Sequence, residues 1–95
     1  MCYIIMLRIL LVEFLGTLFL TFIILASGGN WIAIGGILTV LILLGGSKSG
    51  AAYNPAVAIA YFSAGKIAAS QLAAYIFAEI AGALTAFQLI KMVGL

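Results

Sequence analysis

The stretch SKSGAAYNPAVAIAYFSA, residues 47–64, decides the fold of this chain. It holds Pro55, the only proline, directly after Asn54. Asn is a preferred helix N-cap and Pro suits the first helical position, so we predict a helix from Pro55 to about Ala64. Such a helix is about 15 Å long, half of the ~30 Å hydrocarbon thickness of a bilayer. We therefore expect a re-entrant half-helix with Asn54 near the midplane. An ordinary loop before a surface helix is the alternative, and residues 51–62 are too apolar to favour it.

The composition of the chain indicates a membrane protein. Of its 95 residues, 67% are hydrophobic and 6% are charged, whereas soluble domains carry about 25% charged residues. The length predicts one domain over residues 1–95. A net charge of +2 gives no reason to expect nucleic acid binding. The sequence has no histidine, no nucleophile–base pair and no metal-ligand set, so we expect neither an enzyme nor a cofactor nor a bound metal.

Three further segments are long and apolar enough to cross a membrane as helices. The expected spans are residues 9–26, 31–46 and 67–91. No charge occurs between Glu13 and Lys48, which is too long for one span of ~20 residues, and the turn-forming SGGN at 27–30 divides it. Backbone groups in lipid must bond within their own segment, which favours helices over strands. The predicted fold class is an all-α membrane protein with three transmembrane helices plus one re-entrant half-helix.

The basic residues predict the orientation of this multi-pass integral membrane protein. Arg8, Lys48 and Lys66 fall on one side of the expected spans, and Lys91 falls on the other. Because cytoplasmic segments carry an excess of Lys and Arg, we expect a cytoplasmic N-terminus.

Two glutamates lie within the expected spans. Glu13 shares a helical face with Thr17 and Thr21, and a carboxylate in lipid should face the protein interior with a donor nearby. Its alternative place is the headgroup level, because Arg8 lies only about 7 Å away by helical rise. Glu79 falls at mid-membrane, where we expect it to be protonated or hydrogen-bonded inside the bundle. A structural group or a polar contact to another chain fits Glu79 better than a catalytic carboxylate.

Small residues repeat along two of the expected helices. In the last helix they recur every four residues and form a close-packing face, so we expect a partner helix against it. These residues are Ser70, Ala74, Ala78, Gly82 and Ala86. The second helix carries Gly35, Gly36, Gly45 and Gly46. Those glycines either permit close helix contacts or reflect the higher glycine content of membrane helices.

Three motifs, in this order and spacing, resemble the aquaporin or major intrinsic protein family. They are EFLGT at residues 13–17, SGAAYNPAV at 49–57 and YIFAEIAGA at 75–83. The resemblance runs from about Met6 to the end of the chain and matches the first of the family's two inverted repeats. Val57 follows the Asn-Pro-Ala triplet where the second repeat has arginine, and no second triplet is present.

The resemblance implies a channel for water or small neutral solutes such as glycerol. Its narrow part would hold the Asn54-Pro55-Ala56 triplet, and Ile34 would stand where the family places an aromatic residue of the selectivity constriction. The carbonyls of the preceding link would line the approach; these residues are Gly50, Ala51, Ala52 and Tyr53. Glu13 would hold the N–H groups of that link, as its counterpart does in the family, and Glu79 would give structural support.

The chain departs from the family pattern at three positions. Ala52 replaces a frequent histidine, Glu79 a usual glutamine, and Ile34 the aromatic residue. A single repeat also cannot enclose the family's pore, which leaves three arrangements open. The chain pairs with an inverted copy of itself, or with a separate second-half subunit, or it is a truncated relative that serves as a non-conducting scaffold or assembly protein. The expected partners are the lipid bilayer, water or small neutral solutes, and a homo-oligomer or second-half subunit. The three-to-one bias of basic residues disfavours a dual-topology dimer.

Overall fold

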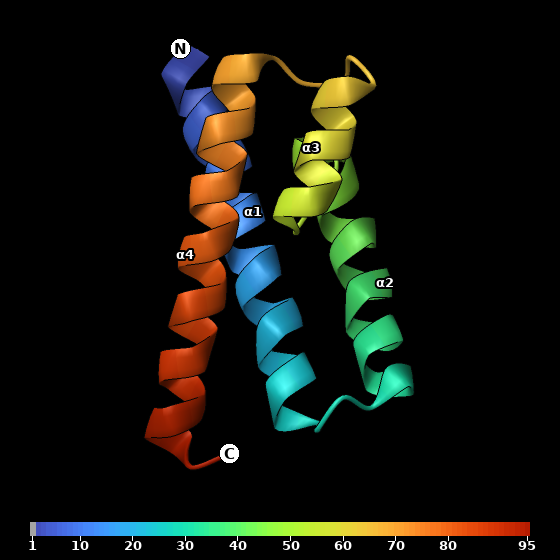
Figure 1. The fold of residues 1–95 in the computed structure, drawn as a ribbon, viewed down its shortest axis with the longest axis vertical. Coiled ribbons are helices and arrows are strands. Elements are labelled where there is room, and N and C mark those ends of the chain that lie inside the picture. Colours follow the sequence, from blue (N-terminus) through green and yellow to red (C-terminus); the bar gives the residue numbers. More distant parts are fainter. Residues whose placement is uncertain (1) are drawn as a thin grey trace.

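The computed structural model describes residues 2–95, which form four helices (Figure 1). The helices are α1 (Cys2–Ala26), α2 (Trp31–Ser49), α3 (Pro55–Ser63) and α4 (Ala69–Val93). By length and composition α1, α2 and α4 can cross a membrane, whereas α3 is only about 14 Å long by helical rise. The described residues contain no strand. The predicted fold class, three spanning helices plus a half-helix, is confirmed.

The ends of the spanning helices differ from those expected. α1 begins at Cys2, because residues 2–8 contain no glycine or proline that would stop a helix. α2 continues through Lys48 and Ser49, beyond the expected end at residue 46. It ends at Gly50, whose φ of 84° and N–H bond to the Gly46 carbonyl form a left-handed cap. α4 begins at Ala69, two residues later than expected, and ends at Gly94, which also has a positive φ.

α1 lies at the centre of the bundle. It packs against both α2 and α4, and α3 packs against α4. Figure 1 shows α1 and α4 running in the same direction, with α2 returning beside α1. α3 occupies only one half of the molecule's height, in front of the C-terminal end of α2 in this view, and its N-terminal end points to the middle (Figure 1). The half-helix is therefore covered on one side by α4.

The small-residue stripe of α4 packs on α1 of the same chain. Ala78, Gly82 and Ala86 are buried. A Cβ atom at Gly82 would lie 2.4 Å from the carbonyl oxygen of Phe14 and 3.1 Å from the backbone nitrogen of Leu18. The backbones of α1 and α4 thus touch at this glycine. α1 itself is thus the partner helix for the buried part of the stripe, whereas Ser70 at its start is exposed.

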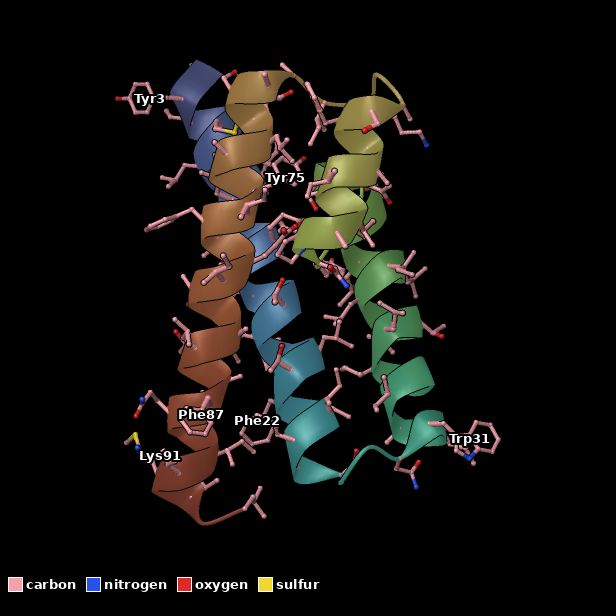
Figure 2. The ribbon with its side chains drawn as sticks, viewed as in Figure 1. Tyr3, Phe22, Trp31, Tyr75, Phe87 and Lys91 are labelled. Carbon is pink, nitrogen blue, oxygen red and sulfur yellow. The ribbon has the colours of Figure 1, made fainter. Side chains whose placement is uncertain are left out.

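Charged and aromatic residues mark the two ends of the molecule. Trp31 projects from the start of α2 with 79% of its surface exposed, at the same end as Lys91 (Figure 2). An exposed tryptophan at a helix end suits the membrane–water interface. The molecule measures 39 × 24 × 20 Å along its principal axes. Its long axis therefore exceeds the ~30 Å hydrocarbon thickness by enough to place both ends at the headgroups.

Candidate functional site

Asn54 caps α3 in the middle of the molecule. Its Oδ1 accepts a hydrogen bond from the backbone N–H of Ala56 at 2.8 Å, and its carbonyl accepts one from Ala58 at 2.9 Å. Pro55 occupies the first helical position, where its missing N–H costs nothing. Because the Asn54 side chain is exposed, its amide nitrogen is accessible beside the positive end of the α3 dipole.

The link from α2 to this cap has an unusual backbone. Ala51 and Tyr53 both have a φ of 54°, in the left-handed region that favours glycine. For other residues this conformation costs roughly 1–2 kcal/mol each. Ala51, Ala52 and Tyr53 are buried nonetheless. The rest of the bundle must therefore hold the link in place.

Glu13 of α1 holds the link by three hydrogen bonds. Its Oε1 accepts from the N–H of Tyr53 at 2.8 Å, and its Oε2 accepts from the N–H of Ala52 at 3.2 Å. Oε2 also accepts from the hydroxyl of Ser49 at 2.5 Å. Glu13 is fully buried, so the headgroup-level alternative for this residue is wrong. Hydrogen bonds to a charged group are worth more than neutral ones and they fix the link's direction.

The ring of Tyr53 fills the space between α1 and α2. A Cβ atom at Gly16 would lie 2.0 Å from this ring, and one at Gly45 would lie 1.9 Å from its hydroxyl oxygen. The hydroxyl donates to the Leu41 carbonyl at 2.7 Å. Only glycine leaves room at both positions, so Gly16 and Gly45 make the socket in which Tyr53 sits.

Two further tyrosines bind the end of α2 and the start of the link. The hydroxyl of Tyr61 in α3 donates to the Gly50 carbonyl at 2.9 Å. The hydroxyl of Tyr75 donates to the Ser49 carbonyl at 2.8 Å, and Figure 2 shows Tyr75 directed from α4 toward α3. Our reading of the sequence assigned these tyrosines no role. Their position in apolar segments could have indicated this role, because a buried tyrosine hydroxyl needs a hydrogen-bond partner.

Glu79 has a different environment from Glu13. It is fully buried in α4 beside Glu13, yet neither of its carboxyl oxygens has a hydrogen-bond partner among residues 2–95. The hydroxyl of Thr17, which is also buried, has none either. These groups lie at the α1–α4 contact, because Thr17 faces Gly82, one turn beyond Glu79.

The structure separates Ile34 from the other predicted site residues. Ile34 lies in the first turn of α2 and is half-buried. Leu41, which binds the Tyr53 hydroxyl, is about 10 Å further along α2 by helical rise. Asn54, Pro55 and the exposed Ala56 are joined instead at the start of α3.

A polar cavity opens beside the link. Its volume is about 300 Å³, and its lining includes Lys48, Gly50, Tyr61, Lys66 and Gln71. Lys66 also lies over the ring of Tyr61, with its Nζ 5.5 Å from the ring centre. The hydrogen-bonding groups of this lining suit a small hydrated solute.

Comparisons with known proteins identify relatives of this arrangement. The family model described as "Major intrinsic protein" matches residues 3–94. Aquaglyceroporin AqpS of Rhizobium meliloti is 43% identical over 60 residues, which cover 63% of this chain and 26% of the relative. Aquaporin NIP1-1 of Arabidopsis thaliana is 35% identical over 96 residues, covering 87% of this chain and 32% of the relative. The chain thus spans about a third or less of the length of these relatives. No solved structure gives a significant match.

Proposed function

Because this chain belongs to the major intrinsic protein family, we propose that it forms one half of a membrane channel for water or small neutral solutes. The observation that carries the proposal is the α3 half-helix, whose Asn54 cap is exposed in the middle of a membrane-spanning bundle. Irregular backbone at that depth occurs where it is buried in protein or lines a wet cavity. The link has both surroundings, with residues 51–53 buried and Asn54 open.

The start of α3 makes a barrier to cations. A helix N-terminus carries a partial positive charge of about half an elementary charge. At mid-membrane, where few solvent dipoles screen it, this charge raises the energy of any cation that approaches, including a hydrated proton. The Asn54 amide nitrogen offers a hydrogen bond to a passing oxygen. A neutral molecule with an acceptor oxygen, such as water or glycerol, meets a donor there and no electrostatic penalty.

The wall opposite Asn54 comes from a second half in this proposal. The described chain covers one side of α3 with α4, whereas the face that carries Asn54 is open. A second half-helix opposite Asn54 would close the path and double the positive barrier. In this proposal that half has the inverted orientation, which a further copy of this chain or a separate second-half sequence would each supply.

The remaining site residues take supporting roles in the proposal. Gly50, Ala51, Ala52 and Tyr53 form the wall that leads to Asn54, and the 300 Å³ cavity beside Gly50 is the vestibule. Glu13 fixes this wall through its three hydrogen bonds. Ile34 lines a later part of the path, toward the Trp31 end, where its aliphatic side chain leaves more room than an aromatic ring.

The distribution of basic residues supports the orientation that we propose. Arg8, Lys48 and Lys66 belong to the end that holds the N-terminus, so we place this end in the cytoplasm. A membrane-impermeant amine reagent added to intact cells should then label Lys91 and spare Lys66. Labelling of Lys66 with protection of Lys91 would reverse the orientation.

Solute flux distinguishes a channel from a scaffold. The chain, purified from its membrane with the partners that it retains, is reconstituted into proteoliposomes for stopped-flow light scattering. Shrinking in response to sucrose reports water permeability, and re-swelling in glycerol reports glycerol permeability. The proposal predicts permeation of at least one of them above that of protein-free vesicles. Permeability equal to that of the lipid alone would favour the non-conducting scaffold.

A further inference from the structure

A groove between α1 and α2 has the chemistry of a lipid site. Its volume is about 440 Å³, and it lies near the N-terminal end of α1 and the C-terminal end of α2. Arg8, Ser47 and Lys48 supply its polar part. Ile5, Ile9 and Val12 are among the apolar residues that supply the rest. One groove therefore combines two cations and a hydroxyl with an aliphatic wall.

The cations of this groove have no carboxylate to neutralise them. The sequence contains only two acidic side chains, Glu13 and Glu79, and both are fully buried. Glu13 is on α1 like Arg8, but its oxygens are taken by Ser49, Ala52 and Tyr53 of the link. Arg8 and Lys48 are exposed. A ligand with negative charge thus gains two attractive contacts and displaces no internal ion pair.

We propose that this groove binds the phosphate group of an anionic phospholipid, with one acyl chain along the aliphatic wall formed by Ile5, Ile9 and Val12. Arginine recognises phosphate through a planar fork of donors, while lysine adds a point charge. Basic pockets between transmembrane helices bind anionic headgroups by this combination. The groove shares Lys48 with the vestibule of the proposed solute path, but lipid binding there does not depend on conduction.

The lining of the groove favours a lipid over a soluble phosphate. The vestibule beside the link also has two lysines, Lys48 and Lys66, but its other lining residues are largely polar. The groove instead continues from its cations onto side chains of α1 that face the hydrocarbon. Ile5 and Leu11 are both more than half exposed, so an acyl chain anchored by its phosphate has a surface for van der Waals packing. A soluble phosphate gains nothing from this wall.

Retention of phosphatidylglycerol by the purified full chain tests the site. The chain in detergent is mixed with phosphatidylglycerol or phosphatidylcholine, and bound lipid is counted by native mass spectrometry. One interfacial cation is worth about fivefold in affinity. Arg8→Gln should therefore weaken phosphatidylglycerol binding about fivefold, and the double change Arg8→Gln with Lys48→Gln about 25-fold.

Lys66→Gln and Lys91→Gln are the matched controls, because each removes one positive charge outside the groove. Both should retain phosphatidylglycerol like the unchanged chain, and phosphatidylcholine should bind weakly to all variants. Equal losses in the controls would reduce the effect to general electrostatic attraction and overturn the site. Competition by inorganic phosphate at equal concentration would also overturn it, because the wall would then contribute nothing. So would a dimer of the chain that excludes lipid from this groove.

Discussion

Glu13 and Glu79 are both fully buried, but they differ in their hydrogen bonds. Three hydrogen bonds reach Glu13 from the link and Ser49, whereas Glu79 receives none from the described residues. The two carboxyl groups are neighbours across the α1–α4 contact, and like charges so close disfavour each other. Glu13 therefore stabilises the link, while Glu79 is buried without a hydrogen bond from the described residues.

Substitution by glutamine should separate these two roles. Glu13→Gln places an amide NH₂ against backbone N–H donors, so it should lower the free energy of unfolding by about 1–3 kcal/mol. Glu79→Gln loses no hydrogen bond and provides a donor for Glu13, so stability should be unchanged or higher. Circular dichroism of unfolding in detergent measures both. A greater loss for Glu79→Gln than for Glu13→Gln would contradict this assignment.

The role of a single residue could be predicted from the sequence where it depends only on neighbouring residues in the chain. Asn54 caps α3 as expected, because capping depends only on Asn, Pro and the residues that follow. The place of Tyr53 was not predictable. Its ring fits only because Gly16 and Gly45 approach it from helices that are distant in sequence, and periodicity within one helix does not report such an approach. For the same reason, the sequence placed Ser49 beyond the expected end of the second span and did not predict its burial against Glu13.

At the scale of the elements, close packing of α1 on α4 distinguishes this bundle from loosely associated helices. The contact depends on Gly82, which lies against the backbone of α1 at Phe14 and Leu18. In lipid, such van der Waals contact replaces the hydrophobic driving force of soluble proteins. Loss of this contact would also move Glu13, which directly precedes Phe14 and lies one turn from Thr17 on the same helix.

Alanine substitutions should report how tightly each element packs. Gly82→Ala brings a methyl group within 2.4 Å of the Phe14 carbonyl oxygen, and such overpacking typically costs about 1–3 kcal/mol. Gly36→Ala is the matched control, since nothing lies within 4 Å of its Cβ position. It should stabilise α2 by up to about 1 kcal/mol through helix propensity. Melting temperatures in detergent measure both changes, and an equal response at the two positions would argue against the α1–α4 contact.

Hydropathy predicted the number and type of the helices, but it did not predict the residues at which they begin and end. The continuous apolar residues of α1 and the turn at residues 27–30 were sufficient to divide the spans. The polar residues Ser47, Lys48 and Ser49 suggested that α2 stops early, but none of them breaks a helix, and Gly50 ends it instead. Helix ends depend on cap geometry, which polarity alone does not reveal.

For the whole molecule, the arrangement leaves one functional face open. α1 is covered by α2 and α4, so its polar residues Glu13 and Thr17 are enclosed. Asn54 instead faces the side that no described helix covers. The half-helix was predictable from the sequence, but the helix that packs on the stripe of α4 was not. Periodicity shows that small residues share one helical face, and it does not show which helix contacts that face. The open face at Asn54, and not the stripe, is the feature on which we base the proposed second half.

Two asparagines of the chain provide a matched pair for testing the role of Asn54. Asn30 caps α2 with its Oδ1 bound to the N–H of Ala33 at 2.9 Å, as Asn54 caps α3. Aspartate keeps the capping oxygen at either position and replaces the amide nitrogen by negative charge. At Asn30 this charge lies in the exposed turn before α2, whereas at Asn54 it lies at the proposed cation barrier.

Proton flux into proteoliposomes, measured with an enclosed pH-sensitive dye beside water flux, tests the barrier most directly. Asn54→Asp should raise proton flux about tenfold, because a charge at a partly buried helix N-terminus is worth up to ~2 kcal/mol and 1.36 kcal/mol is tenfold in rate. Asn30→Asp should match the unchanged chain in both fluxes. Identical proton and water fluxes in the Asn54→Asp, Asn30→Asp and unchanged proteins would contradict a pore at Asn54.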